Sequence, residues 1–491
     1  MRKIGMATAI VAALAWQTAR AQNSKATLEA AVRALGAANL TSIQYSGGGS
    51  NNAFGQAFRP NMPWPAFKVT SYTAFIDYSA PAMRVELERT NPDGPVRGGG
   101  GLPLLAPQKQ IQVVSGKAAW NVAPAAGAAA PAANPAPAAV NDRLLQIWTS
   151  PHGVLKAAQA NNATIAGRVI TFPAAGTTVK ATLGADNLVQ RVETRADTPV
   201  LGDTVTETTY SNYRDFSGVK FPTHIVQKQG GFPVLDLTIT DVRPNATVTI
   251  DVPQNVQQAA AQPQQGPPPV RVDTQKVADG VYHLTGGTHN SVAVEFSDHI
   301  VVVESPLDDN RAVAVIDAVK KAIPNKPIKY LVNTHNHFDH LGGVRAFVAE
   351  GVTIITQVQN KPYYEKVWAV PHTVSPDRLA KSPKKAVIET VAEKRVLTDG
   401  TRQLALYRLP NNHNDTMLVA YLPKEKILIE ADLFNPPAAN APPAPAVNPL
   451  NVNLYDNIQR LKLNVDQIAP LHGRLITIKD LQAAIGKSST N

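Results

Sequence analysis

The chain has 491 residues, of which 44% are hydrophobic and 17% charged, a composition that suits a folded protein and excludes an intrinsically disordered one. This length exceeds that of one ordinary domain, so we expect two. The sequence has no cysteine, which excludes disulfides, thiolate metal ligands and lipid attachment at an N-terminal cysteine. The net charge of +10 comes without a dense block of Lys and Arg, which favours a solvated basic surface over a nucleic-acid site.

The first 21 residues have the pattern of a secretory signal peptide. Arg2 and Lys3 precede a short apolar stretch from Ile4 to Trp16, and residues 19–21 form an Ala-x-Ala cleavage site. The alternative is a membrane anchor, but a spanning helix needs about 20 apolar residues. We therefore expect cleavage after Ala21, export to the periplasm and no stable membrane insertion.

Residues 22–252 have the pattern of a mainly antiparallel β domain of unknown role. A helix is expected over Lys25–Gly36 and a helical patch over Asp142–Ala160, while Ala123–Ala139, almost entirely Ala and Pro, is expected to be a flexible or extended loop. Turn signals separate segments with the alternation of strands. These strands are expected at Lys68–Tyr78, Met83–Thr90, Gln110–Ser115, Thr178–Leu183, Leu188–Thr194, Thr204–Phe216 and Val234–Val242.

This strand rhythm, together with the segment Tyr213–Pro222, resembles the periplasmic lipoprotein-carrier class, in which helices close a curved antiparallel sheet. The resemblance covers roughly residues 25–250 and rests on no specific motif. Two lone histidines of this region, His152 and His224, have no catalytic cluster around them and are interpreted as structural. Residues 253–270 are mostly Gln, Ala and Pro and are expected to form the linker to a second domain.

In residues 271–491 strands alternate with helices, which predicts a layered α/β or α+β domain. Strands are expected at Val281–Leu284, Ser291–Phe296, His299–Glu304, Ile328–Asn333, Val352–Thr356, Leu404–Leu409, Met417–Leu422 and Ile427–Ile429. Helices are expected at Arg311–Ile323 and Gly342–Glu350, along the apolar face of Leu450–Leu461, and at Ile478–Ile485.

The segment Thr334–His340 carries the chemistry. It holds His335, His337, Asp339 and His340 directly after an apolar strand, and strand ends are where layered α/β folds place their sites. Their alternation along an extended turn lets the first two histidines face one metal ion and the last two residues a second. Histidine and aspartate suit zinc where thiolate is absent.

Three later residues each stand at the end of a strand-like run: His413, Asp432 and His472. Taken singly, each is interpreted as a loop or capping residue rather than as a metal ligand. Of the 11 histidines in the chain, however, five fall into this one ordered set. The set therefore predicts a metal centre that all seven residues share.

The order H-x-H-x-D-H, then His, Asp and His, resembles the metallo-β-lactamase superfamily with the ligand set of its glyoxalase II and lactonase branches. The resemblance covers about residues 272–488 and implies an αββα sandwich, so that the whole chain would be an α+β protein. It further implies two zinc ions per chain. His335, His337 and His413 would bind the first zinc, Asp339, His340 and His472 the second, and Asp432 both.

The function implied is a metal-dependent hydrolase in which zinc-bound hydroxide cleaves an ester, lactone or thioester bond of a small-molecule substrate. Asp339 would be catalytic, orienting the hydroxide and later delivering a proton. Three alternatives stay open: a β-lactam hydrolase, a periplasmic binding or carrier protein whose metal domain is structural, and an iron redox protein. The last would have Glu where His337 stands. The oligomeric state stays unknown.

Some features depart from the superfamily pattern. Glu304 stands where many members have Asp, a supporting position. The segments 357–399 and 435–449 align with no known pattern and are expected to frame the pocket. His289, in a Gly-Gly-Thr-His-Asn loop, fits a substrate contact and a plain loop residue equally well.

Overall fold

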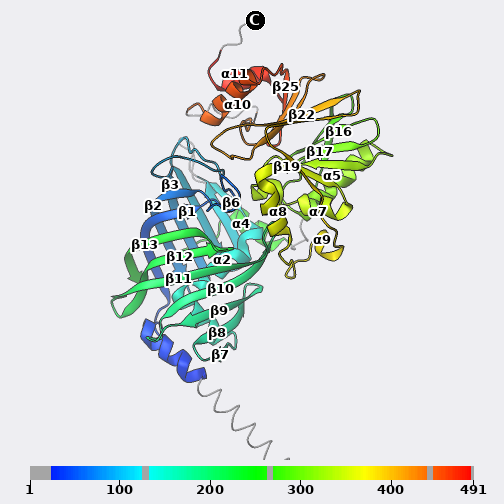
Figure 1. Ribbon diagram of the computed structural model, residues 1–491. Helices are drawn as coiled ribbons and strands as arrows, with labels where there is room; N and C mark the ends of the chain where they lie inside the picture. The colour runs from blue at the N-terminus through cyan, green and yellow to red at the C-terminus, as the bar shows by residue number, and fades with distance from the viewer. Residues whose placement is uncertain (1–23, 124–131, 263–268, 439–445, 488–491) are drawn as a thin grey trace, which may run out of the picture.

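The computed structural model describes residues 24–123, 132–262, 269–438 and 446–487. The chain forms an N-terminal β-sheet domain and a C-terminal layered α/β domain that lie against each other (Figure 1). The expected signal peptide lies outside the described residues, so it stays a prediction. Within the described ranges, no helix is both long and apolar enough to cross a membrane.

One 13-stranded antiparallel sheet makes up the N-terminal domain. Its order is β6-β5-β4-β3-β2-β1-β13-β12-β11-β10-β9-β8-β7. The strands are β1 (Ser42–Asn52), β2 (Ala66–Asp77), β3 (Ala82–Thr90), β4 (Gln108–Ser115), β5 (Ala118–Ala123), β6 (Ala132–Pro135), β7 (Thr164–Ala166), β8 (Val169–Ala174), β9 (Thr177–Leu183), β10 (Val189–Thr198), β11 (Gly202–Phe216), β12 (Val219–Gln229) and β13 (Phe232–Pro244). The mainly antiparallel architecture expected from the strand rhythm is confirmed.

Helices pack against this sheet. Residues 24–35 are helical, and η1 (Pro137–Ala139), α2 (Val140–Thr149) and α3 (Pro151–Ala160) follow β6. Ile147, Val154 and Leu155 are buried in one core with strand residues such as Phe172 and Phe221. The helical patch expected at Asp142–Ala160 is therefore two short helices, with the Ser150 side chain accepting a hydrogen bond from Gly153 N at the start of the second.

Two low-complexity segments are more ordered than their composition suggests. Residues 132–135 of the expected loop Ala123–Ala139 form β6, which pairs with β5, while 124–131 lie outside the described residues. The first part of the expected linker is helix α4 (Gln254–Ala261), and its Val256 is buried against Val113 and Trp120. Residues 254–261 of the expected linker therefore form a helix, which packs on the sheet through Val256 and the partly buried Ala260.

Two sheets form the centre of the C-terminal domain. The first has the order β14-β15-β16-β17-β18-β19-β20 and the second β21-β22-β23-β24-β25-β26. Their strands are β14 (Asp273–Ala278), β15 (Val281–Thr285), β16 (Ser291–Glu295), β17 (Ile300–Val303), β18 (Ile328–Val332), β19 (Thr353–Gln357), β20 (Ile388–Val391), β21 (Lys394–Thr398), β22 (Gln403–Arg408), β23 (Leu418–Leu422), β24 (Ile427–Glu430), β25 (Gln467–Pro470) and β26 (Ile476–Thr477).

Helices cover the outer face of each sheet, which gives the expected αββα sandwich. The helices are α5 (Asp309–Ala322), α6 (Phe338–Leu341), α7 (Val344–Glu350), η2 (Val358–Asn360), α8 (Lys361–Trp368), α9 (Arg378–Lys381), α10 (Pro449–Arg460) and α11 (Ile478–Ala484). One core holds residues of both sheets with α10 and α11, and another holds α5, α7 and α8 against the first sheet. The predicted fold class is confirmed.

The local sequence explains the central strands. All four residues of β17 are buried, because this strand pairs in parallel with β18 and is covered on both faces. Helix α5 begins where the Asp308 side chain accepts a hydrogen bond from Arg311 N, and Lys320 and Lys321 lie in its last turn. Helix α5 is the crossover between the parallel strands β17 and β18. The carboxyl ends of these two strands therefore lie side by side.

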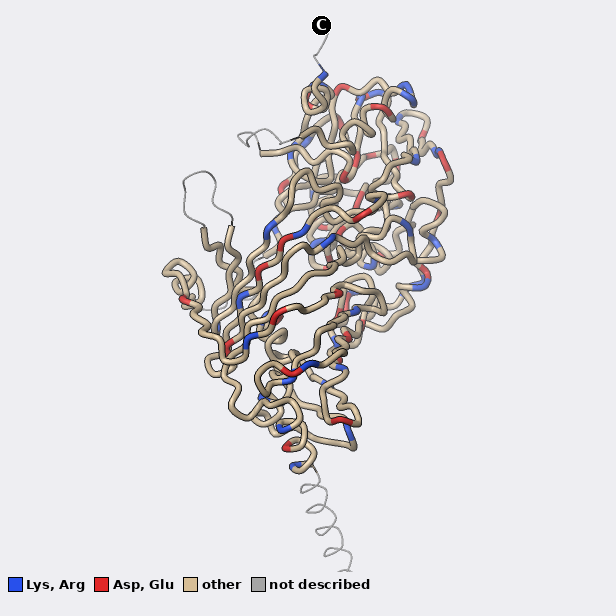
Figure 2. The backbone as a smooth tube through the Cα atoms, turned by 90° about the vertical axis from the view of Figure 1, so that its left-hand side faces the viewer, with Lys and Arg blue, Asp and Glu red and all other residues tan. Residues whose placement is uncertain are grey.

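A large cavity of about 1170 Å³ lies on the N-terminal sheet and reaches the C-terminal domain at residues such as Asp308 and His372. Its lining mixes aromatic and aliphatic side chains with glutamines and threonines. Acidic and basic residues are distributed over both domains and do not gather in one region (Figure 2). The charge pattern therefore agrees with a solvated surface.

Candidate metal centre

The seven residues expected in the metal centre all lie at one edge of the sandwich, where strands end. The motif of residues 334–340 follows β18, and α6 carries Asp339 and His340. His413 lies in the loop from β22 to β23, Asp432 follows β24 and His472 follows β25. Since β18 is parallel to its neighbours and β24 is parallel to β25, these carboxyl ends meet at the same edge.

One cluster consists of His335, His337 and His413, all buried, with candidate ligand atoms within 4.8 Å of one another. The ring centroid of His337 lies 4.4 Å from the ring centroid of His335 and 4.6 Å from that of His413. Three of their nitrogens are buried without a hydrogen-bond partner: His335 Nε2, His337 Nδ1 and His413 Nε2. Because unpaired buried polar atoms are costly, three that converge indicate a site built for a cation.

These rings are neutral at neutral pH. Burial and the neighbouring His340 lower the pKa of His335 well below its usual value, and burial and His413 lower the pKa of His337 to about 3. Burial also lowers the pKa of His413. Each ring therefore keeps a nitrogen lone pair available for a metal.

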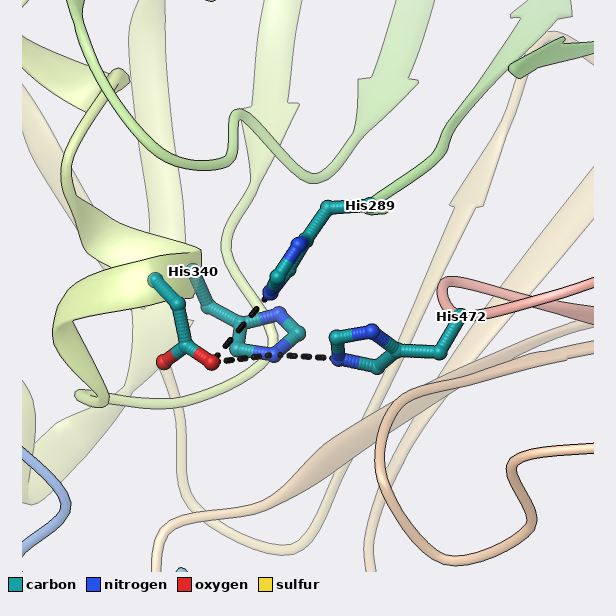
Figure 3. A group of neighbouring side chains, drawn as sticks. His289, His340 and His472 are labelled. Atoms are coloured by element: carbon teal, nitrogen blue, oxygen red, sulfur yellow. Dashed lines mark hydrogen bonds and ion pairs between the residues drawn. The ribbon is translucent and has the colours of Figure 1, made fainter. Parts of the chain in front are cut away.

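The second cluster consists of His289, Asp339, His340 and His472. His289 Nε2 lies 3.2 Å from Asp339 Oδ2, and His340 Nε2 lies 3.1 Å from His472 Nε2. Figure 3 shows the three histidine rings directed toward one another from separate segments of the chain. Burial would raise the pKa of Asp339, but His340 and the hydrogen bond from His289 bring it below its usual range, so this carboxylate is ionised.

Asp432 lies between the two clusters. Its Oδ2 is 2.8 Å from His340 Nε2, 3.6 Å from His335 Nε2 and 3.7 Å from His413 Nε2, while its Oδ1 is 3.3 Å from His472 Nε2. Its φ of +62° is in the left-handed region, which is uncommon for a residue other than glycine. Such backbone strain is typical of functional positions, where the surroundings hold a side chain in a required place.

The buried Glu304 supports this arrangement from behind. Its carboxylate accepts hydrogen bonds from His340 Nδ1 at 3.0 Å, from Asn333 Nδ2 at 2.8 Å and from the Thr334 hydroxyl. Burial opposes a charge on His340, but Asp432 and Asp339 raise its pKa well above the usual value. With Nδ1 fixed by Glu304, His340 would lose a proton from Nε2 when a metal binds there.

His289 and Tyr364 are among the residues at the site that lie beyond the seven predicted. His289 could have been assigned only from the fold, since its loop joins β15 to β16 and its own sequence is uninformative. Tyr364, in α8, comes from the segment 357–399 that had no recognisable pattern. Its hydroxyl lies 3.2 Å from His335 O and also contacts Asn333 Oδ1, so this insertion holds the motif loop in place.

The donor set fits zinc. It offers imidazole nitrogens and carboxylate oxygens without thiolate, and the first cluster holds one ligand atom of each histidine within 4.8 Å of the others. The second cluster lies next to it, and the Asp432 carboxylate is within ion-pair distance of both clusters. This arrangement is suited to two adjacent metal ions that share one carboxylate.

Comparison with known proteins agrees with this geometry. Residues 284–454 match the family model of the metallo-beta-lactamase superfamily. The matched region runs from the end of β15 into α10, and so contains six of the seven predicted residues; His472 follows it.

Two curated relatives are similar over a short stretch. A linear primary-alkylsulfatase from a Pseudomonas species is 36% identical over 76 residues, which are 15% of this chain and 11% of that protein. An alkyl/aryl-sulfatase of Saccharomyces cerevisiae is 27% identical over 85 residues, 17% of this chain and 13% of that protein. The chain thus matches about an eighth or less of the length of these relatives.

Solved structures similar to this chain include a metallo-beta-lactamase from Pontibacter korlensis, with a TM-score of 0.33 and 21% identity over 44% of this chain and 98% of that one. Another is a metallo-beta-lactamase from Hirschia baltica, with a TM-score of 0.33 and 18% identity over 43% of this chain and 95% of that one.

Proposed function

Since its C-terminal domain belongs to the metallo-beta-lactamase superfamily of hydrolases, we propose that this protein binds two zinc ions and hydrolyses an ester, lactone or thioester bond of a small molecule. The observation that carries the proposal is the convergence of three unpaired buried histidine nitrogens beside a second cluster, with Asp432 between them.

The proposed ligands follow the two clusters. His335, His337 and His413 hold the first zinc ion, and Asp339, His340 and His472 hold the second. Asp432 contacts both sets, so its carboxylate would be a ligand that the two ions share. His289 belongs to the second cluster but is not assigned as a ligand, because its Nε2 lies 3.2 Å from Asp339 Oδ2.

The chemistry divides between the metals and the side chains. Zinc bound at this site would supply Lewis acidity, which typically lowers the pKa of a coordinated water to about 7. Asp339 is ionised and half-buried, so its carboxylate would orient the attacking water by accepting a hydrogen bond from it. It would take a proton from this water as the water attacks, and afterwards deliver that proton to the leaving group. His289 positions Asp339 through the contact between its Nε2 and Oδ2.

The bonds proposed for cleavage are ester-type bonds, for two reasons. The curated relatives are named as alkylsulfatases, so sulfate esters join carboxylate esters, lactones and thioesters as candidates. In addition, a bridging Asp432 adds negative charge between the metals, which favours oxygen and sulfur leaving groups over an amide nitrogen that needs more stabilisation. Hydrolysis of β-lactams is the alternative, and we expect it to be slower than hydrolysis of ester-type bonds.

A panel of chromogenic substrates tests the proposal. Zinc-loaded protein would be assayed with carboxylate esters, lactones, thioesters, alkyl sulfates, phosphodiesters and β-lactams, and its metals identified by elemental analysis. We expect turnover of at least one ester-type class, abolished by Asp432→Ala. Turnover of β-lactams with every ester untouched would reverse the substrate ranking, and iron in place of zinc would favour the redox alternative.

The cavity on the N-terminal sheet favours a second candidate role, the binding of an apolar ligand by that domain. Its lining includes Tyr72, Phe221 and Leu235, and its volume of about 1170 Å³ suits a small molecule. A fluorescent apolar probe should bind the purified protein and be displaced by unlabelled ligand. Placing a charge in the lining with Val85→Arg should abolish this binding while zinc content stays the same.

A further inference from the structure

Two loops of the N-terminal domain lie over the metal centre of the C-terminal domain. The first, residues 53–59, follows β1, and the second, residues 97–100, lies between β3 and β4. We call these loops the cap. Several backbone hydrogen bonds join the cap to the C-terminal domain: Phe338 N to Gly55 O at 3.2 Å, Asp415 N to Phe58 O at 3.0 Å and Gly98 N to Asn412 O at 2.9 Å.

The cap contacts Asp339 through Gln56. The side-chain amide of Gln56 donates from Nε2 to Asp339 Oδ1 at 2.7 Å, while its Oε1 accepts from Gly100 N at 2.9 Å. Asp339 Oδ2 is engaged by His289. Gln56 therefore fixes one carboxylate oxygen of Asp339, and the second loop of the cap fixes Gln56.

The cap also contacts His337. The Nε2 of this ring lies 3.1 Å from the carbonyl oxygen of Ala57, which accepts a second hydrogen bond from Asn414 Nδ2 at 3.2 Å. A carbonyl oxygen only accepts, so His337 carries its proton on Nε2 and leaves the lone pair on Nδ1. That Nδ1 is the nitrogen of this ring that is buried without a hydrogen-bond partner.

The fit between cap and metal centre is close. A Cβ atom placed on Gly99 would lie 2.6 Å from His337 Cε1 and 2.1 Å from Gln56 Oε1. The φ of Gly99 is not in the left-handed region, so the cost of an alanine there is argued from these contacts. Around this contact, Phe54 and Trp64 of the N-terminal domain pack against Phe338 with ring centroids 5.3 and 6.1 Å away.

From these contacts we infer that the N-terminal domain completes the metal centre of the C-terminal domain. Ala57 O and Gln56 are its positioning groups: the first orients His337 toward one metal position and the second orients Asp339 toward the other. The inference rests on the proposed function, since it takes His337 and Asp339 as zinc ligands. It assigns the N-terminal domain a direct part in metal binding, whatever ligand its cavity takes.

A thermodynamic consequence follows. If cap and metal stabilise the same conformation of His337 and Asp339, zinc binding strengthens the contact between the domains, and loss of the cap weakens zinc binding by the same factor. Hydrogen bonds that orient metal ligands typically contribute roughly 10- to 100-fold to metal affinity. The effect is therefore large enough to measure directly.

The test uses the full-length protein and four variants. Gln56→Leu removes the donor to Asp339 at similar volume, and Gln56→Glu keeps the acceptor for Gly100 N but sets a carboxylate against Asp339. Gly99→Ala pushes the cap away from His337. Gly287→Ala is the control, because this exposed glycine also lies near the centre, yet its added Cβ would meet only Arg311 at 3.9 Å.

Zinc affinity would be measured by competition with a chromophoric chelator, and unfolding by calorimetry with and without zinc. We expect the three cap variants to lose roughly 10- to 100-fold in zinc affinity and Gly287→Ala to match wild type. We also expect zinc to raise the unfolding temperature of the N-terminal domain in wild type and less in the variants. For Gln56→Leu, kcat should fall while KM changes little.

The outcomes separate this inference from the proposed function. If wild type binds two zinc ions and cleaves an ester while Gln56→Leu and Gln56→Glu bind zinc as tightly as wild type, the cap has no part in the centre and the inference is overturned alone. If wild type binds no zinc, both are overturned. Should Gly99→Ala fail to fold, the two Gln56 variants decide, since neither adds a backbone contact.

Discussion

Replacement of Glu304 by glutamine separates the charge of the carboxylate from its shape. Glu304 is fully buried and accepts hydrogen bonds from His340 Nδ1, the Thr334 hydroxyl and Asn333 Nδ2. A glutamine has one oxygen and one NH₂ group, so in either orientation its NH₂ faces a donor. At least one of the three donors is then left unpaired, which costs about 1–3 kcal/mol.

The same loss acts on zinc through His340. Because Glu304 holds Nδ1 of this ring, it leaves Nε2 directed at the second cluster, only 2.8 Å from Asp432. Removal of such an orienting bond lowers metal affinity roughly 10- to 100-fold, which corresponds to about 1.4–2.8 kcal/mol. We expect Glu304→Gln to weaken one of the two zinc sites by this amount and leave the other nearly unchanged.

Glu430→Gln is the matched control. Glu430 is equally buried, but its Oε2 accepts only from the backbone nitrogens of Leu433 and Phe434. Burial and the nearby Asp432 raise the pKa of Glu430 to about 8, so it is mostly protonated at neutral pH and glutamine is its neutral counterpart. Stepwise chelator competition at pH 7 measures both variants; equal zinc affinity in Glu304→Gln and wild type would mean that Glu304 does not orient His340 for zinc.

Four other predictions follow from the site and the fold. Asp432→Ala should reduce the zinc content below two per chain by elemental analysis, because it removes the carboxylate that contacts both clusters. Asp339→Asn should lower kcat far more than it raises KM in steady-state assays, since it acts on the attacking water. Burial lowers the pKa of His152 to about 4 in the folded protein, so its contribution to stability is full above about pH 6.5 and falls by up to about 3 kcal/mol toward pH 4; His152→Gln should flatten this part of a pH-dependent denaturation profile. Mass spectrometry of protein from the native host should find Gln22 at the N-terminus; an intact Met1 would contradict the export proposal.

The sequence was most informative where chemistry is local. Residues 334–340 carry four ligand-type side chains within one turn, so the centre of the site could be identified without the fold. Apolar runs such as β17 and the helical face of α5 predicted the layers of the C-terminal domain, because buried parallel strands and amphipathic helices have distinct patterns.

Long-range contacts could not be predicted in this way. Gln56 meets Asp339 across 283 positions of sequence, and nothing in the segment around Gln56 indicates a metal centre. Strand β1 was also missed, because its Ser-Gly-Gly-Gly-Ser run has the composition of a loop. Its Gly47 is required there by the neighbouring strand, since a Cβ would lie 2.0 Å from Thr238 O. Such requirements come from tertiary packing and leave no periodic signal.

Two zinc ions at this site and hydrolysis that depends on them can be checked together, by elemental analysis of the purified, zinc-loaded protein and an ester-hydrolysis assay on the same sample. We predict close to two zinc ions per chain, because the three histidines of the first cluster and the second cluster around His340 each form a separate site. We also predict that hydrolysis follows zinc occupancy. One zinc ion or none per chain after loading, or hydrolysis that persists when zinc is removed, would show that these residues do not form a catalytic two-zinc centre.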